Sequence, residues 1–406
     1  MSSSPCAVRL HNYNPYGNNH CFYIDMAGLL AAAILFLIDR HRSSVWASPV
    51  AHATTRGPSA SSSVCKEFDV AIPASAPGAR YDLRTVDTDL DAAAWAIESS
   101  AWSAPPGNEL VLENITISGT YNIHGRLCAP SAGGGGVLQI ASHGAHYDGR
   151  YWDADPPGHS YVDAALDAGY SILTYDRLSA GRSDHPDAYT GVQAPLELEI
   201  LRELTTLARN GTLASMTGVG AAPNKTVHVG HSYGSFLTTA FIATYPELTE
   251  GAVITGFVLN RYLGSVGDAP WAVRRAPDRP PGYVLCEKVG IQNLFFAGDF
   301  TQAQLDLGDS LKQAVPVAEI TSGYELLGAT GPFKGPIHYM LAEKDFYICG
   351  GDCRGLYSVP QQYKIFPNAS DIQIDLQPDT GHALPMHNNA TAGFQVSFDF
   401  LAKHRL

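Results

Sequence analysis

From residue 137 onward, short apolar runs alternate with helical runs, and this alternation restricts the possible folds more than any other feature of the sequence. The apolar runs have the length of strands and lie at 137–142, 171–176, 226–231, 252–257, 337–342 and 372–376. Runs with helical character lie at 161–168, 195–209, 236–245 and 391–403. Such alternation predicts a mostly parallel sheet with helices on both faces.

Two other regions complete the predicted organisation. Residues 110–117 and 121–127 are β-like, and Ser118-Gly119-Thr120 between them predicts a hairpin. Residues 258–335 break the alternation, because they are first rich in Pro and Arg and then aromatic, which favours an inserted cap. We therefore divide the chain into a leader and linker (1–64), a first core part (65–257), the cap (258–335) and a second core part (336–406).

The segment Gly230-His231-Ser232-Tyr233-Gly234 follows one apolar strand directly and precedes a helix. A Gly-X-Ser-X-Gly match alone is weak, but between a strand and a helix it is typical of a nucleophile elbow. The glycines remove side chains that would collide in so sharp a turn. Ser232 is thus the candidate nucleophile, and a glycine-rich turn without catalytic function is the alternative.

A serine hydroxyl needs a base to take its proton, and a third group to orient that base. His382 follows the last predicted strand, whereas its competitor His387 is predicted to lie in the next helix. Asp345 follows the strand at 337–342 and gives the chain order serine, acid, histidine. Two nearby carboxylates, Asp352 and Glu343, are alternatives to it.

An oxyanion would require two backbone N–H donors. The first is expected from Tyr233, which follows the nucleophile, and the second from the His143-Gly144-Ala145-His146 loop, with Ala145 as our choice. His143 and His146 also have the appearance of a metal pair. No third ligand accompanies them, so we expect neither a metal nor another cofactor.

From about residue 110 to its end, the chain resembles the α/β-hydrolase superfamily of the AB hydrolase-1 type. More narrowly, it is similar to a group of secreted fungal members. The resemblance rests on Gly119-Thr120-Tyr121-Asn122-Ile123, Arg126-Leu127-Cys128, His143-Gly144, Tyr151-Trp152-Asp153, Tyr175-Asp176-Arg177, Gly181-Arg182-Ser183-Asp184, Val192-Gln193-Ala194-Pro195 and the elbow. It implies a sheet of about eight strands, a cap after the sixth, and a structural role for Asp176-Arg177 beside the oxyanion loop. The chain departs from the pattern at Ala180, where many members have Gly, and in the long gap before His382.

These residues predict hydrolysis of an ester or lactone of a small molecule through an acyl-enzyme. Acyl transfer would use the same residues, and a non-catalytic binding protein on the same fold is the hypothesis from another class. Epoxide hydrolase or dehalogenase chemistry is disfavoured, because the resemblance implies an elbow aspartate for those enzymes. Aromatic residues of the predicted cap suggest an apolar substrate, although ordinary packing explains them equally well; they are Trp271, Tyr283, Phe295, Phe296 and Phe300. Members of the fungal group differ in substrate, and some accompany natural-product pathways.

The N-terminus predicts entry into the secretory pathway. Residues 26–38 form an uncharged apolar run that is too short to span a membrane but fits a signal peptide or signal anchor. Sequons at Asn114, Asn210, Asn224, Asn368 and Asn389 favour the same route. With a net charge of −13 and no long basic cluster, the chain has little support for binding nucleic acid.

In an oxidising compartment, the cysteines beyond the leader predict two disulfides. We expect Cys65–Cys128 and Cys349–Cys353. Cys286 in the predicted cap is a competing partner for the second pair, because sequence alone does not fix connectivity.

Overall fold

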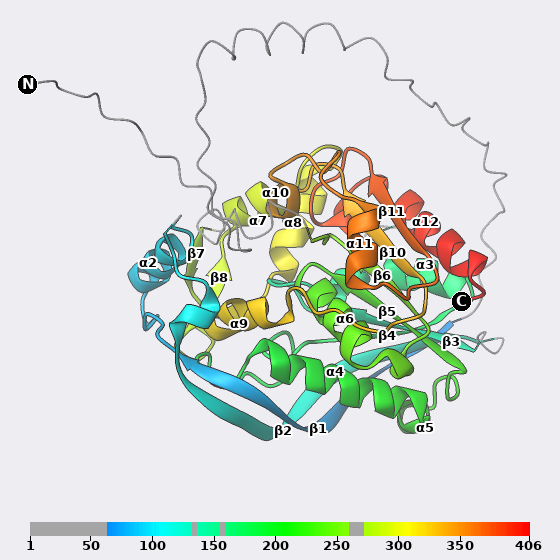
Figure 1. Cartoon of the computed structure of the whole chain (residues 1–406), viewed down its shortest axis with the longest axis horizontal. Coiled ribbons are helices and arrows are strands. Elements are labelled where there is room, and N and C mark those ends of the chain that lie inside the picture. Colours follow the sequence, from blue (N-terminus) through cyan, green and yellow to red (C-terminus); the bar gives the residue numbers. More distant parts are fainter. Residues whose placement is uncertain (1–62, 102, 132–135, 155–158, 260–271) are drawn as a thin grey trace, which may run out of the picture. The chain divides into compact units, whose positions relative to one another are not determined.

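Eight strands of the described chain form the main sheet, in the order β1-β2-β4-β3-β5-β6-β10-β11 (Figure 1). Their bounds are β1 Ser63–Tyr81, β2 Val111–Pro130, β3 Val137–Ser142, β4 Ser171–Tyr175, β5 Lys225–His231, β6 Gly251–Thr255, β10 Ile337–Ala342 and β11 Ile372–Gln377. Both β1 and β4 pair with β2 in antiparallel fashion, and the remaining neighbours are parallel. This confirms the predicted α/β-hydrolase fold with a mostly parallel sheet.

The fold is that of a computed structural model, which describes residues 63–406 except 102, 132–135, 155–158 and 260–271. Residues 1–62 of the predicted leader and linker therefore lie outside the described residues. Among the described helices, none has both the length and the apolar character needed to cross a membrane.

Helices cover both faces of the sheet. On one face α3 (Tyr161–Asp167) packs against α12 (Ala390–Lys403), and on the other α4 (Ala194–Arg209) packs against α6 (Tyr233–Thr244) (Figure 1). The other described helices of the core are α2 (Asp89–Ser99), α5 (Thr212–Thr217), α10 (Phe346–Cys349) and α11 (Val359–Ile365). The described part of the core also contains four 3-10 turns: η1 Gly107–Leu110, η2 Gly149–Trp152, η3 Pro246–Leu248 and η6 Leu384–Met386. The predicted helices thus appear within a few residues of their expected bounds.

The hairpin predicted around Ser118 is wrong. Residues 111–130 form one strand, β2, which pairs along its length with β1, so that Ser118 lies opposite Ser75. Gly119 makes no turn; a side chain there would collide with the Tyr121 ring, which comes within 2.9 Å of the place of its Cβ. The glycine thus makes room for a neighbouring ring within an extended strand.

Between β6 and β10 the chain leaves the main sheet. Its described part there forms a small antiparallel sheet, β7-β8-β9, with helices on either side. The bounds are β7 Val273–Arg275, β8 Tyr283–Cys286, α7 Lys288–Phe295, α8 Gln302–Leu311, β9 Val315–Pro316, α9 Val317–Ser322 and η5 Gly323–Leu326. We call these elements the cap. The hydroxyl of Tyr81, the last residue of β1, donates a hydrogen bond to Glu325 and so connects the end of β1 to the cap.

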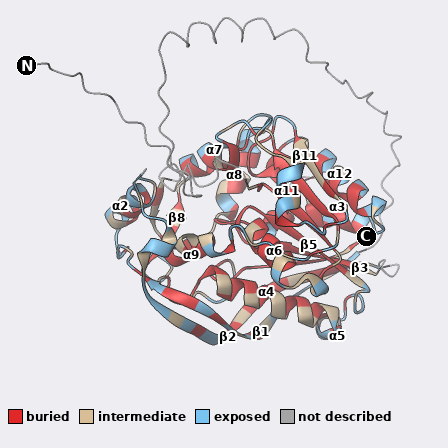
Figure 2. Ribbon diagram, in the orientation of Figure 1, coloured by how far each residue is buried: buried red, intermediate tan, exposed pale blue. Residues whose placement is uncertain are grey.

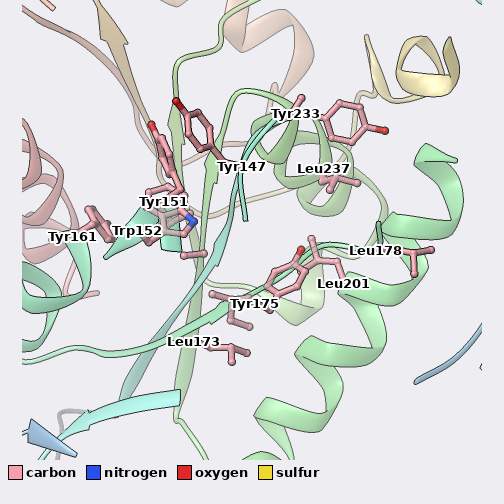
Figure 3. Close-up of a cluster of buried hydrophobic side chains, with 14 of the residues drawn as sticks. Tyr147, Tyr151, Trp152, Tyr161, Leu173, Tyr175, Leu178, Leu201, Tyr233 and Leu237 are labelled. Carbon is pink, nitrogen blue, oxygen red and sulfur yellow. The ribbon is translucent and has the colours of Figure 1, made fainter. Parts of the chain in front are cut away.

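The core lies along the central strands, whose residues are almost all buried (Figure 2). Beside them Tyr147, Tyr151, Trp152 and Tyr161 form a run of neighbouring rings (Figure 3). Three of them, Tyr147, Tyr151 and Trp152, belong to the segment that follows β3, so their burial anchors this segment in the core.

Both predicted disulfides are present. Cys65 lies opposite Cys128 in the β1–β2 ladder with a Cα–Cα distance of 4.1 Å, and Cys349 and Cys353 are 5.0 Å apart. Cys286 is buried in the cap and joins no disulfide among the described residues. The competing pairing through Cys286 is therefore excluded.

Candidate active site

Ser232 lies in the tight turn between β5 and α6, with φ 53° and ψ −116°. Few residues with a side chain adopt such a backbone, and strain of this kind gathers at functional sites. Both flanking glycines are required by space. A Cβ at Gly230 would come within 2.5 Å of the Gly234 carbonyl oxygen, and one at Gly234 within 2.1 Å of the Ser142 carbonyl oxygen.

His382 and Asp345 lie side by side. The Nδ1 atom of His382 is 2.6 Å from Oδ2 of Asp345, and both side chains are almost fully buried. The other carboxylate oxygen accepts the Ile348 amide at 2.9 Å, because Asp345 caps the N-terminus of α10. Of the two alternative acids, Asp352 is exposed and pairs with Arg354, and Glu343 accepts the Asp379 amide. The structure thus places Asp345 at the histidine.

Parallel pairing of β10 with β11 brings the two loops together. Ala342 and Gln377, the last residues of these strands, are partners in the ladder. Immediately beyond it, the Lys344 amide donates to the Thr380 carbonyl at 2.8 Å. Chemistry-bearing residues at the carboxyl ends of neighbouring parallel strands meet in this way at one edge of a sheet.

The free nitrogen of His382 faces a small cavity shared with Ser232. Within the described chain, Nε2 of His382 is buried and has no hydrogen-bond partner, Ser232 included. Catalytic hydrogen bonds are often long or absent before substrate binds. The cavity has a free volume of about 20 Å³, roughly the space of one water molecule. Its lining comprises Ala145, Ser232, Tyr233, Phe236, Phe295, Ile320, Tyr347 and His382.

The two expected oxyanion donors border this cavity. Tyr233 is the first residue of α6, where a helix leaves its N–H groups unused. Ala145 follows Gly144, and a Cβ on Gly144 would lie 2.9 Å from Cβ of Ser232. Within the described residues, neither the Tyr233 nor the Ala145 amide donates a hydrogen bond. Both amides are therefore available beside the serine.

Arg177 contacts the loop that carries Ala145, which we call the oxyanion loop. Its Nε donates to the His143 carbonyl at 3.0 Å, and its guanidinium lies 4.5 Å from the centre of the Tyr233 ring. It also pairs with two buried carboxylates, Glu197 of α4 and Glu319 of α9. Burial raises the pKa of Glu197 to about 8, although the positive charge of Arg177 acts to lower that pKa. One buried network thus joins the oxyanion loop, the elbow and the cap.

The two histidines of the oxyanion loop, His143 and His146, are fully buried. His143 Nδ1 donates to the Gly144 carbonyl, and its Nε2 accepts the Arg177 amide. Burial lowers the pKa of His146 to about 4. Among the residues that the structure describes, no group of three or more His, Cys, Asp or Glu side chains is placed to hold a metal ion.

Of the aromatic residues predicted in the cap, only Phe295 lines the cavity. Tyr283 is buried against Pro186, and Phe296 and Phe300 pack on His387. Trp271 lies outside the described residues.

Sequence reasoning missed three cavity residues, Phe236, Ile320 and Tyr347. It also misplaced His387, which directly follows η6 and precedes α12 instead of lying within that helix. The Pro385 turn ahead of it was the available signal for a break in the helix.

A sequence profile described as "Alpha/beta hydrolase family" matches residues 140–394. No curated protein matches the sequence. Among solved structures, the chain is similar to a thermophilic esterase from Thermogutta terrifontis, with 13% identity, a TM-score of 0.44, and coverage of 70% of this chain and 94% of that one. It is also similar to a monoacylglycerol lipase from Paleococcus ferrophilus, with 12% identity, a TM-score of 0.46, and coverage of 66% and 94%.

Proposed function

The chain belongs to the alpha/beta hydrolase family, and we propose that within this family it is a serine hydrolase that cleaves a small ester or lactone. The observation that carries the proposal is the arrangement at one cavity. Ser232 stands in a strained elbow, and His382 presents an unpartnered Nε2 while Asp345 holds its Nδ1. A nucleophile, a base and an acid in these positions are the parts that acyl transfer requires.

In the proposed reaction, Ser232 Oγ attacks the carbonyl carbon while Nε2 of His382 takes the hydroxyl proton. The carbonyl oxygen becomes an oxyanion, which accepts hydrogen bonds from the Tyr233 and Ala145 amides. The imidazolium then gives its proton to the leaving alcohol, and an acyl-serine ester forms. Water, deprotonated by His382, attacks this ester, the bond between the acyl carbon and Ser232 Oγ breaks, and His382 returns the proton to Oγ as the acid leaves. Asp345 accepts a hydrogen bond from Nδ1–H throughout and stabilises the imidazolium.

Apart from Ser232 and His382, the lining residues carry apolar or aromatic side chains, and the free volume of the cavity is small. This supports a short, apolar acyl group as the first substrate class to test. We expect kcat/KM to be higher for p-nitrophenyl acetate than for the octanoate ester. The resemblance to secreted fungal members makes a natural-product ester a narrower hypothesis, for a later substrate screen.

A fluorophosphonate probe tests the enzyme directly. We expect it to label the wild type but not Ser232→Ala, and we expect that variant to lose about 10⁴- to 10⁶-fold in rate. Ser310→Ala is the matched control, since Ser310 is an exposed serine of cap helix α8. Equal labelling of wild type and Ser232→Ala would refute the proposal. Absence of any labelling would favour the non-catalytic alternative, and product esters formed with added alcohol would favour acyl transfer.

We further propose that the protein passes through the secretory pathway. Two disulfides support this, because reducing compartments do not keep such bonds. N-terminal sequencing of the protein from a eukaryotic host should show the loss of the first 40 to 55 residues. A chain that still begins at Met1 would argue against a cleaved leader.

A further inference from the structure

The loop that carries His382 is short and lies between the end of β11 and η6. It needs a fixed backbone, because its direction sets where the imidazole points. Two side chains that follow in the chain hold it. His387 bonds to the residues on either side of His382, and Asn389 bonds farther back, where its Nδ2 donates to the Pro378 carbonyl at 2.6 Å.

The His387 contacts determine its protonation. The Gly381 amide donates to Nε2 at 3.0 Å, and Nδ1 donates to the Ala383 carbonyl at 2.8 Å. An amide N–H and a carbonyl cannot exchange these roles, so the ring is neutral with its proton on Nδ1. A proton on Nε2 would point at the Gly381 N–H and break the contact. Both ring nitrogens are therefore occupied, and His387 cannot be the base.

The ring is also held by the cap. Phe296 stacks on it with ring centres 5.5 Å apart and an angle of 24°, and Phe300 meets it at 5.9 Å. The imidazole is fully buried. Burial lowers the pKa of His387 to about 4, while nearby Asp299 acts to raise that pKa and His159 to lower it. The neutral form is thus the resting form at neutral pH.

The cap runs alongside the same loop. The Ala383 amide donates to the Phe295 carbonyl at 2.9 Å, and the Asp299 amide donates to the Asp379 carbonyl at 2.8 Å. Gly381 has no room for a side chain, since a Cβ would lie 2.4 Å from the Ala297 nitrogen. The cap thus packs on one side of the loop, while His387 bonds the backbone directly before and after His382.

We propose that His387 is a positioning residue for the base: by bonding the backbone at Gly381 and Ala383, it fixes the orientation of His382 toward Asp345 and Ser232. The inference rests on the proposed function, in which His382 is the base. It assigns a role to a second buried histidine, one that acts only through the first.

His387→Phe tests this role, because phenylalanine keeps a ring for Phe296 to stack on and removes both hydrogen bonds. The matched control is His338→Phe. His338 is also buried and stacks on Phe400 at 24°, but it lies near the start of β10, away from the site. We expect kcat to fall about 10- to 100-fold in His387→Phe, with KM within about twofold, since small misplacements of reacting groups are costly. The control should keep both constants within about twofold.

A double-mutant cycle separates positioning from general packing. In a His382→Ala background, the added His387→Phe change should leave the residual rate unaltered. A loss of the same factor in both backgrounds would overturn the proposal. Should His387→Phe fail to fold, His387→Asn keeps a donor near the Ala383 carbonyl and should show an intermediate loss; an Asn variant with wild-type kcat would equally overturn it.

A readout independent of activity is the far-downfield proton resonance of Nδ1–H in His382, expected from its short bond to Asp345. It should be present in wild type and in His338→Phe, and shifted or lost in His387→Phe. An unchanged resonance in the latter would refute positioning. Activity in Ser232→Ala would instead refute the proposed function, so the two failures are distinguishable.

Discussion

Nδ1 of His382 lies 2.6 Å from Oδ2 of Asp345, although His382 comes 37 positions later in the chain. The intervening segment holds α10, the Cys349–Cys353 disulfide, α11 and β11. Because β11 returns parallel to β10, the segment begins and ends at the same edge of the sheet. The gap that departs from the family pattern therefore contains additional structure and leaves the pair in contact.

Asp345→Asn should lower kcat on the order of 10³- to 10⁴-fold, because an amide would favour the wrong tautomer of His382. Asp352→Asn should have little effect, since Asp352 is exposed and pairs with Arg354. Steady-state kinetics on an activated ester measure both. If Asp352→Asn were the inactive variant, the acid would have to be reassigned.

Gly144→Ala should impair catalysis while leaving the fold intact. The added methyl would lie 2.9 Å from Cβ of Ser232 and 3.2 Å from the His231 carbonyl oxygen, so the oxyanion loop must shift. A loss on the order of 10²-fold in kcat is expected when an oxyanion donor is displaced. Gly251→Ala is the control, because its methyl meets the flexible Leu406 side chain. Equal activity of the two variants would contradict the assignment of this loop.

The two disulfides should contribute unequally to the free energy of unfolding. Cys65–Cys128 spans a sequence separation of 63 and Cys349–Cys353 one of 4. Loop-closure entropy then predicts a loss of about 4 kcal/mol for the double serine variant of the first pair and about 2 kcal/mol for that of the second. Denaturant titration measures both losses, and a larger loss for the short loop would contradict this account.

Four sequons, not five, should carry glycans if the protein is secreted. Asn114, Asn210, Asn224 and Asn368 are exposed. The Asn389 amide is engaged instead, because Nδ2 donates to the Pro378 carbonyl and Oδ1 accepts from Gln377 and Thr380. Peptide mapping after glycosidase treatment reads the occupancy of each site. A glycan on Asn389 would contradict this prediction, because it would occupy the nitrogen that donates to the Pro378 carbonyl.

Stability should fall as the pH decreases below about 6.5. Burial lowers the pKa of His228 from its usual 6.5 to about 3 in the folded state. The unfolded chain therefore binds a proton more readily, so the stability that the neutral ring contributes is present above pH 6.5 and lost toward pH 3.

For His228 alone, the loss at pH 4.5 is on the order of 2–3 kcal/mol. His228→Phe removes the titrating ring, and its stability deficit relative to wild type should shrink by this amount between pH 7 and 4.5. Denaturation midpoints at the two pH values give the difference, and a deficit independent of pH would refute the assignment.

The parts of this protein that sequence alone determined are those set by local patterns. Short apolar runs placed the strands at 137–142 and 337–342 with their observed bounds, because runs of this length that alternate with helical segments fit buried strands. The elbow around Ser232 was evident because its glycines, strand and helix are contiguous. The position of His382 after the last predicted strand ranked it ahead of His387, whereas Asp345 kept two alternatives, Asp352 and Glu343.

Tertiary structure decided whatever depends on partners distant in the chain. The residues around Ser118 resembled a turn, yet β1 supplies a partner along the whole of β2, and extended pairing satisfies more backbone hydrogen bonds than a hairpin there would. The use of both His387 nitrogens, and the neutral state of this ring, depend on which backbone groups meet it in the buried interior. No local pattern encodes such contacts, because they exist only once the His382 loop and the cap have packed together.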